Sequence, residues 1–384
     1  MQYTKLKNIN KYKSENINPA KTPDTVFEMY SVPIYETGHP EYLRGSQIAS
    51  NKAVVEKNDI LVCKINPRIN RVWIVSDESD NLNIASSEWI VVRNNEYNPE
   101  FLAWYFRTPR FQKLMTSEVT GIGGSLTRAQ PKSVAEYPVP VLDRNTQNEI
   151  VARLNKCKII IDSKEQELEQ LDTLVKSRFV EMFGDIITGK YNYKIRKLGD
   201  VAFIGSSHRV FTTEFVESGI PFYRGTEIGE LANGIEPSEP YYISEEHYNK
   251  LTKDNTKPRI GDLLMPSICN KGQIWMVDTD RPFYYKDGRV LCISPNRDIF
   301  NSKYLEYFMR IKTLVEYPKL GSGSTFAEFK IFLLKDMDVL VPPRNVQNQF
   351  ADFVASVDKS KSKIQKSLEE TQLLFDSLMQ KYFG

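Results

Sequence analysis

The sequence contains an internal repeat, and this repeat limits how the chain can fold more than any other feature. Residues 144–148 read RNTQN and residues 344–348 read RNVQN, an offset of 344 − 144 = 200 residues. The same offset brings residues 183–184 onto residues 383–384 without a gap. Matches at one offset over this distance indicate a tandem duplication, in which each copy forms a similar unit.

The two copies also match upstream, but at other offsets. Residues 59–61 resemble residues 262–264 at an offset of 203, and residues 42–45 resemble residues 222–225 at an offset of 180. The difference, 203 − 180 = 23, predicts 23 extra residues in the second copy, around residues 229–260. Each copy is therefore expected to have a variable part followed by a better-matched part.

A long helix is predicted at the end of each copy. Apolar residues recur at spacings of three and four from Ile150 to Met182, and in the same phase from Phe350 to Tyr382. This is the heptad pattern of helices that pair through an apolar seam. Roughly 35 residues make a helix of about 50 Å. That is too long for one small domain to cover, so we expect the two helices to pair with each other. The alternative is that each helix packs only on its own domain. Four polar residues interrupt the seam and favour one defined register: Lys164, Arg178, Lys361 and Thr371.

Each variable part is predicted to be a mixed α/β unit, because runs rich in β-branched and aromatic residues alternate with turn residues. Strands are expected at residues 60–62, 72–75, 89–92, 274–277 and 290–293, and helices at residues 99–115 and 301–315. The predicted fold class is α/β (α+β): two tandem domains and two long helices that form an antiparallel intramolecular coiled coil, arranged as a pseudo-two-fold dumbbell. The predicted boundaries are 1–143 for the first domain, 144–184 for the central helix, 185–343 for the second domain and 344–384 for the C-terminal helix.

Composition argues against several classes of protein. The 4 cysteines and 3 histidines are scattered and form no CxxC pair, so neither a zinc site nor a disulfide framework is expected. No apolar run reaches the roughly 18–20 residues that span a bilayer, and the first residues do not begin a signal sequence, so a cytoplasmic protein is expected. The 51 basic residues nearly balance the 49 acidic ones. Any affinity for nucleic-acid phosphates must therefore come from a local patch.

Basic residues cluster locally in both variable parts, together with amides and hydroxyls. DNA binding uses this mixture to neutralise phosphates and to read base edges. Arg44 and Arg224 each precede a glycine, and the glycine-containing loops at residues 121–128 and 321–325 would let the backbone approach phosphate closely. The alternatives are a solvated surface and flexible connectors. The predicted DNA-contacting residues are Arg44, Lys64, Arg68, Arg71, Ser125, Thr127, Arg128, Ser206, Ser207, Arg209, Arg224, Lys271, Gln273, Ser322, Ser324 and Thr325.

The doubled arrangement resembles the specificity subunit of type I restriction–modification systems, the HsdS family. A glycine-containing segment, a proline-containing step and a helix start with glutamine carry the resemblance, which covers essentially the whole chain. These elements are residues 121–130, 137–140 and 144–148 in the first copy, and residues 321–325, 341–343 and 344–348 in the second. The first copy departs from the family pattern at Val141-Leu142, where the second has a valine followed by two prolines.

The resemblance implies a function in defence against phage. Each variable part would be a target-recognition domain that binds one half of a bipartite site in double-stranded DNA. The helices would set the spacing and dock two methyltransferase subunits, which use S-adenosylmethionine to methylate adenine. Two restriction subunits, which use ATP and Mg²⁺, can join such a complex. The chain itself would be no enzyme, with no catalytic residue, metal or cofactor of its own.

Other functions stay open at this point. One is a stand-alone or orphan two-headed DNA-binding protein without a methyltransferase partner. Another is a coiled-coil scaffold that binds only proteins, which would show no salt-dependent affinity for duplex DNA. A nuclease or methyltransferase is disfavoured, because the sequence has no Asn-Pro-Pro-aromatic motif and no complete nuclease motif around Glu328.

Overall fold

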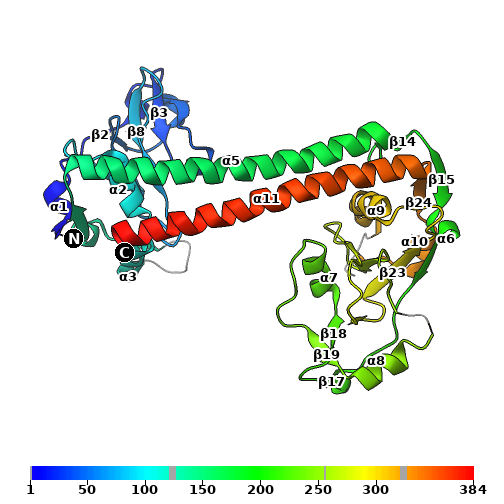
Figure 1. Ribbon diagram of the computed structural model, residues 1–384. Coiled ribbons are helices and arrows are strands. Elements are labelled where there is room, and N and C mark those ends of the chain that lie inside the picture. The colour runs from blue at the N-terminus through cyan, green and yellow to red at the C-terminus, as the bar shows by residue number, and fades with distance from the viewer. Residues whose placement is uncertain (1, 121–126, 255–256, 321–326) are drawn as a thin grey trace. The chain divides into compact units, whose positions relative to one another are not determined.

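The computed structural model of the protein describes residues 2–120, 127–254, 257–320 and 327–384 (Figure 1). The chain divides into two compact units. Unit 1 consists of Met1–Gln166 and Gln365–Gly384, and unit 2 consists of Glu167–Ile364. The division falls within the two long helices, so each unit contains part of both.

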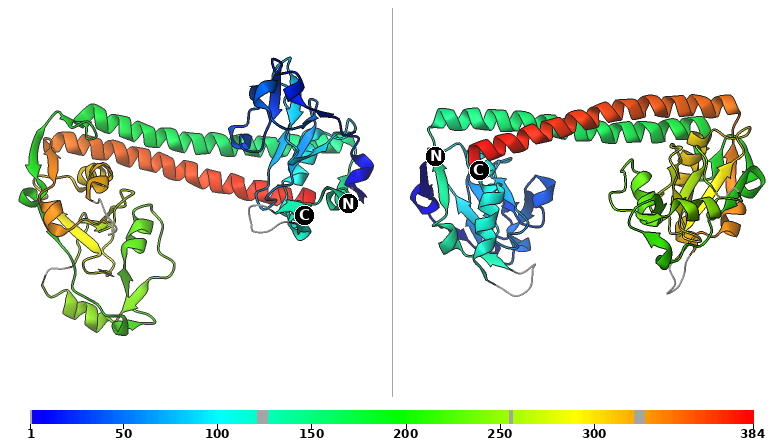
Figure 2. Two further views of the ribbon diagram at one scale, coloured as in Figure 1. Left: turned by 180° about the vertical axis from the view of Figure 1, so that it is seen from behind. Right: turned by 60° about the horizontal axis from the view of Figure 1, so that its bottom comes forward.

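The long helices are α5 (Arg144–Phe183) and α11 (Arg344–Phe383), each of 40 residues. In unit 1, Arg153 near the start of α5 donates a hydrogen bond of 3.1 Å to the hydroxyl of Tyr382 near the end of α11. In unit 2, Lys361 of α11 forms an ion pair of 2.8 Å with Asp172 of α5. The helices therefore run side by side in opposite directions in each unit, which confirms the predicted antiparallel pair (Figures 1 and 2). The pseudo-two-fold dumbbell stays a prediction.

Unit 1 is a mixed α/β unit. Its elements before α5 are β1 (Gln2–Lys5), α1 (Leu6–Ile9), β2 (Asn16–Ile17), η1 (Pro19–Lys21), β3 (Val26–Tyr30), η2 (Tyr35–Thr37), β4 (Glu41–Arg44), η3 (Gly45–Gln47), β5 (Lys52–Val54), β6 (Ile60–Cys63), β7 (Val72–Ile74), β8 (Leu82–Ala85), β9 (Trp89–Val92), α2 (Pro99–Phe106), α3 (Pro109–Ser117), β10 (Val119–Thr120), β11 (Arg128–Ala129), α4 (Pro131–Val134) and β12 (Pro138–Val141). The strands form a five-stranded sheet of order β2-β5-β8-β3-β4, a three-stranded sheet of order β7-β6-β9, and the pairs β1-β12 and β10-β11.

Unit 2 is also a mixed α/β unit, whose elements lie between α5 and α11. They are β13 (Gly184–Asp185), β14 (Lys190–Tyr191), β15 (Lys194–Lys197), α6 (Leu198–Val201), β16 (Ala202–Gly205), η4 (Thr212–Glu214), β17 (Phe215–Val216), β18 (Ile220–Tyr223), α7 (Gly225–Leu231), β19 (Tyr241–Ile243), α8 (Glu245–Leu251), β20 (Leu263–Pro266), β21 (Trp275–Met276), β22 (Tyr284–Tyr285), β23 (Val290–Pro295), α9 (Ser302–Glu316), η5 (Tyr317–Leu320), α10 (Ile331–Lys335) and β24 (Asp338–Val341). The sheets have the orders β16-β23-β20-β21 and β17-β19-β18-β22, with the pairs β13-β14 and β15-β24.

The buried glutamine of each RNxQN repeat explains why this segment is alike in the two copies. The side-chain oxygen of Gln147 accepts the backbone N–H of Asn98, and that of Gln347 accepts the backbone N–H of Asn301, both at 2.8 Å. Each glutamine amide also donates to a carbonyl five residues earlier, again at 2.8 Å in both units. Asn98 and Asn301 are the N-caps of α2 and α9, so the glutamine joins the long helix to the helix that packs beneath it.

An aromatic side chain at the end of each long helix completes one of the cores. Phe383 is 2% exposed, and its ring lies 5.4 Å from that of Phe101 in unit 1. Phe183 is 0% exposed, and its ring lies 4.7 Å from that of Tyr304 in unit 2. The end of α5 thus packs in unit 2 and the end of α11 packs in unit 1.

One predicted helix is divided. The helix expected at residues 99–115 is the two helices α2 and α3, because Thr108 caps a new helix: its hydroxyl accepts the N–H of Phe111 and Pro109 occupies the first turn. A proline at that position has no N–H to donate to the preceding helix. The helix expected at residues 301–315 is continuous as α9.

Strand topology defines which residues of the two units are equivalent. Strand β3 lies between the parallel strand β8 and the antiparallel strand β4, and β18 lies between the parallel strand β22 and the antiparallel strand β19. The N–H of Ser86 donates to the carbonyl of Tyr30 (3.1 Å), as the N–H of Lys286 does to the carbonyl of Tyr223 (2.9 Å). Strand β3 is therefore equivalent to β18, and Tyr30 to Tyr223.

This equivalence corrects the sequence match between Arg44 and Arg224. Arg44 ends the edge strand β4, whereas the residue equivalent to Arg224 is Ser31, at an offset of 224 − 31 = 193. The extra sequence in unit 2 is then 203 − 193 = 10 residues rather than 23. The match at residues 42–45 is only four residues long, too short to define an alignment without the strand order.

Candidate nucleic-acid interface

Two of the predicted contact residues, Arg224 and Gln273, line a cleft of unit 2. The cleft has a volume of about 520 Å³. It lies where β18 meets α7, beside the end of β20 and the turn between β22 and β23. Its described lining contains three cations and several neutral hydrogen-bond donors and acceptors. None of these lining residues is an aspartate or a glutamate. The lining residues are Arg224, Gly225, Thr226, Pro266, Ser267, Ile268, Asn270, Gln273, Lys286 and Arg289.

Arg224 is held in place at this cleft by a buried acid. Its Nε lies 3.2 Å from Glu227 Oε1, and its backbone N–H donates to Glu227 Oε2 at 2.7 Å. The guanidinium also lies 4.5 Å from the ring centre of Tyr241. Burial raises the pKa of the Glu227 carboxyl, but hydrogen bonds from Arg224 lower that pKa more, so the group stays ionised near neutral pH. An arginine has five N–H donors, more than one carboxylate can accept, so a fixed guanidinium can still bind a ligand.

Two further predicted residues lie at the same place. Gln273 lines the cleft, and its side-chain oxygen accepts the backbone N–H of Lys271 at 3.0 Å. Lys271 is exposed. The structure therefore brings three of the predicted residues of unit 2 together.

Ser206 and Ser207 contact the backbone on either side of the turn that carries Lys286 and Arg289. The hydroxyl of Ser206 donates to the carbonyl of Val290 (3.0 Å), and that of Ser207 donates to the carbonyl of Tyr285 (2.5 Å). Arg209 forms an ion pair of 3.2 Å with Asp287. These side chains fix the turn between β22 and β23.

In unit 1, three predicted residues come together at the end of β6. The N–H of Ala129 donates to the carbonyl of Lys64 (2.9 Å), and the N–H of Asn66 donates to the carbonyl of Thr127 (2.8 Å). Arg128 forms two hydrogen bonds of 3.1 Å with Glu88. Lys64, Thr127 and Arg128 therefore form one polar patch.

The remaining predicted residues of unit 1 are more scattered. Arg68 is exposed in the turn after β6, and Arg71 is half-buried beside the start of β7. Arg44 is exposed but belongs to the five-stranded sheet rather than to the sheet that contains β6.

Four predicted residues, Ser125, Ser322, Ser324 and Thr325, lie outside the described residues. Sequence reasoning missed Lys286 and Arg289, which complete the cleft of unit 2. Both follow the strand run at Tyr284–Tyr285. The signal that could have identified them is their position in the turn before the predicted strand at residues 290–293.

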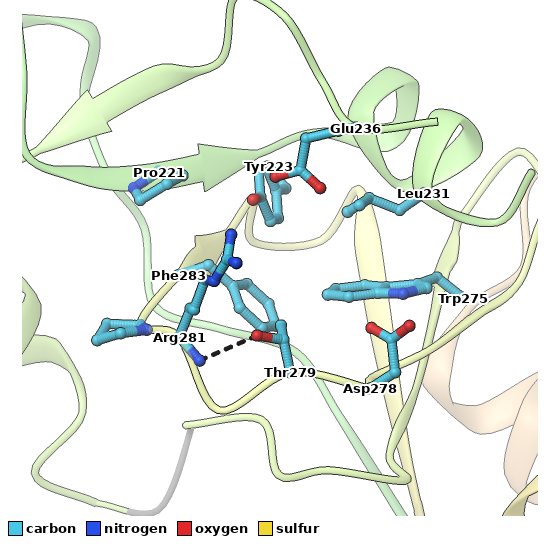
Figure 3. Close-up of a pocket in the computed structure, with 10 residues that line it drawn as sticks. Pro221, Tyr223, Leu231, Glu236, Trp275, Asp278, Thr279, Arg281 and Phe283 are labelled. Carbon is cyan, nitrogen blue, oxygen red and sulfur yellow. Dashed lines mark hydrogen bonds between the residues drawn. The ribbon is translucent and has the colours of Figure 1, made fainter. Parts of the chain in front are cut away.

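A second cavity of unit 2, of about 330 Å³, has a different character. Figure 3 shows aromatic rings of Tyr223, Trp275 and Phe283 around it, with Arg281 and Glu236 extending toward the same side. Asp278 adds a second carboxylate to the lining. Two carboxylates against one guanidinium do not favour a phosphate, so this cavity is the weaker candidate for nucleic acid.

Among the described residues, no helix is both long and apolar enough to cross a membrane. The helices α5 and α11 have the length but carry charged residues throughout.

No protein-family model matches the sequence. The fold, however, matches solved structures. One is a chain from a study described as "Structural basis underlying complex assembly and conformational transition of the type I R-M system"; it is 20% identical, with a TM-score of 0.60 over 100% of this chain and 97% of that chain. Another is the type I restriction–modification system S subunit from M. genitalium, 13% identical, with a TM-score of 0.58 over 100% of this chain and 96% of that chain. The chain therefore has the fold of the S subunits of type I restriction–modification systems.

Proposed function

We propose that this chain is the DNA sequence-specificity subunit of a type I restriction–modification complex and contributes no catalytic residue to it. The observation that carries the proposal is the whole-length fold match to an S subunit. It is supported by the duplication, since two similar units in one chain suit a target of two separate half-sites.

The surface chemistry of each unit is compatible with duplex DNA. The cleft of unit 2 combines Arg224, Lys286 and Arg289 with amides and hydroxyls. Cations of this kind neutralise phosphates, and arginine, asparagine and glutamine bind base edges in the major groove. Unit 1 would use the patch around Lys64 and Arg128.

The long helices would dock the partner subunits. The helices carry exposed apolar side chains, which are the proposed contacts for these partners. These are Ile159 (68% exposed), Leu373 (70%) and Leu374 (53%) in unit 1, and Leu174 (48%) and Val180 (47%) in unit 2. The proposed partners are two methyltransferase subunits, which would bring S-adenosylmethionine, and two restriction subunits, which would bring ATP and Mg²⁺.

The test is methylation of a random duplex library by this chain, produced together with a methyltransferase subunit of a type I system from the same source. Sequencing would locate the modified adenines. We expect a bipartite motif with a fixed spacer, and we expect that motif to disappear when this chain is omitted.

The result can also contradict the proposal. Methylation that is unchanged without the chain would rule out the specificity role. No methylation at all, combined with salt-dependent binding of the purified chain to duplex DNA, would instead identify a stand-alone DNA-binding protein.

A further inference from the structure

The two units carry the same backbone hydrogen bonds around the end of β6 and the end of β20. The N–H of Lys64 donates to the carbonyl of Glu88 (3.0 Å), and the N–H of Ser267 donates to the carbonyl of Arg289 (2.8 Å). Lys64 is therefore equivalent to Ser267, and Glu88 is equivalent to Arg289.

A second shared hydrogen bond fixes a third pair of positions. The N–H of Ala129 donates to the carbonyl of Lys64 (2.9 Å), as the N–H of Phe329 does to the carbonyl of Ser267 (2.7 Å). Ala129 and Phe329 are thus equivalent. The residues that precede them, which are Arg128 in unit 1 and a glutamate, Glu328, in unit 2, occupy the same place.

Both units have an ion pair at these positions, but its polarity is reversed. In unit 1, Arg128 Nε lies 3.1 Å from Glu88 Oε2; in unit 2, Arg289 Nη1 lies 2.8 Å from Glu328 Oε2. In each pair the arginine side chain is the more exposed partner, at 41% against 27% in unit 1 and 59% against 30% in unit 2. The carboxylate is shielded and the guanidinium faces outward.

The neighbouring positions follow the same reversal. Arg224 and Lys286, which line the cleft of unit 2 together with Arg289, are equivalent to Ser31 and Ser86 in unit 1. Unit 1 instead has a lysine, Lys64, where unit 2 has a serine. The cations of the two units therefore occupy different positions on the two equivalent surfaces.

We propose that Arg128 and Arg289 are specificity-determining residues, each binding a guanine edge in the half-site of its own unit, and that Glu88 and Glu328 are positioning residues that orient them. This inference rests on the proposed function. Arginine binds guanine O6 and N7 with two parallel hydrogen bonds. A carboxylate that already orients the guanidinium reduces the conformational entropy that the arginine side chain loses on binding. Because the arginine comes from a different segment in each unit, the two units would place their guanine contacts differently.

A purely structural ion pair would explain the contacts equally well, so the test must keep the pair while moving the arginine. The double variant E88R/R128E gives unit 1 the polarity that unit 2 has naturally, and R289E/E328R does the reverse. Both retain an arginine–glutamate pair at the same positions. A structural role predicts that each double variant behaves as the unchanged protein.

The assay is the methylation of the random duplex library described above, with the full chain and its methyltransferase subunit. For E88R/R128E we expect a changed base preference in the half-site of unit 1 and an unchanged half-site of unit 2. For R289E/E328R we expect the converse. The conservative variants R128K and R289K keep the charge but lose the two-pronged geometry. Each should lower the preference for guanine at one position by roughly 10-fold to 100-fold.

The outcomes separate this inference from the proposed function. A bipartite motif in the unchanged protein that both double variants and both lysine variants reproduce would overturn the inference and leave the proposed function intact. The absence of any bipartite motif in the unchanged protein would overturn the proposed function itself. Should a double variant fail to fold, which circular dichroism would show, the lysine variants decide alone: an unchanged motif overturns the inference.

Discussion

Gln147 and Gln347 accept the N–H of an asparagine N-cap at the same distance, 2.8 Å, in unit 1 and in unit 2. Nearly sixty residues earlier in each copy, Glu88 and Arg289 occupy equivalent places with opposite charge. The two units thus agree where the chain packs beneath the long helices, and differ where side chains face outward around the ends of β6 and β20.

The contrast follows from what a substitution costs at each place. A buried hydrogen-bonding group that loses its partner costs about 1–3 kcal/mol, so the glutamines tolerate little change after a duplication. Exposed ion pairs contribute only about 0–1 kcal/mol, so positions such as Arg128 and Glu328 can change charge without loss of the fold. Divergence between the copies is then expected to concentrate at surfaces that select a ligand.

The strongest test of the shared framework is the removal of its buried aromatic rings. F183A should destabilise unit 2 and F383A should destabilise unit 1, each by about 3–5 kcal/mol, because each leaves a cavity in a packed core. Hydrogen exchange would show which unit loses protection. The matched control is L373A on α11, whose side chain is 70% exposed and whose loss should change stability by less than about 0.5 kcal/mol. Equal loss of protection in both units for either phenylalanine variant would contradict the assignment of one aromatic to each core.

The glutamines should have a smaller effect. Q147L and Q347L each leave a shielded backbone N–H and a shielded carbonyl without their partner, so we expect a loss of about 2–4 kcal/mol. The loss should be the larger for Q347L, because the Gln347 amide also donates to the carbonyl of Ile299 at 2.9 Å. Urea unfolding would measure it. The exposed neighbours Asn148 and Asn348, which bond the same N-cap residues at 2.9 and 3.0 Å, provide the controls N148A and N348A. A large effect in one copy only would show that the framework is less alike than the distances indicate.

Much of this framework could be predicted from the sequence, because packing repeats itself in the residue pattern. The offset of 200 identified the RNxQN segments, and the heptad phase from Ile150 to Met182 predicted a helix that the structure gives as Arg144–Phe183. Its antiparallel partner followed from the length, since a rod of this size needs cover along its whole length. Lys361, one of the polar residues that interrupt the apolar seam, forms an ion pair with Asp172 of the other long helix.

The candidate site could be predicted only in part. Arg224 and Gln273 were found from their residue types, but Lys286 and Arg289 join them only because strand β22 pairs with β18. Parallel pairing of strands some sixty residues apart leaves no short-range pattern in a single sequence. The same cause explains the false match of Arg44 with Arg224, since the strand order, and not the local sequence, makes Ser31 the equivalent residue.

One lysine can be removed from the cleft of unit 2 and one can be added at the equivalent position of unit 1. K286A should weaken binding of duplex DNA by the complex uniformly across sequences and reduce the slope of log K against log salt by about one, because one phosphate contact is lost. S86K, which places a lysine at the equivalent position of unit 1, should increase that slope by about one. Titration of a fixed duplex at several salt concentrations measures both. If neither variant changes the slope, the turn between β22 and β23 does not contact the DNA backbone.

The smallest expected effect is the pH dependence that the Arg224–Glu227 pair of unit 2 adds to the stability of the chain. The pKa of Glu227 in the folded chain lies below its unfolded value of about 4.5, because the hydrogen bonds from Arg224 outweigh the effect of burial. The stability from this pair is therefore complete above the unfolded pKa and is lost as the pH falls through the folded pKa. Between pH 6 and pH 3, urea midpoints should show that the unchanged protein loses more stability than E227Q does, by at most about 1 kcal/mol. S31A provides the control, because Ser31 is the residue of unit 1 equivalent to Arg224 and has no titratable side chain. Between pH 6 and pH 3, S31A should lose as much stability as the unchanged protein does. If E227Q loses as much as the unchanged protein, the Arg224–Glu227 pair does not stabilise unit 2, and the orientation of Arg224 must depend on Tyr241 instead.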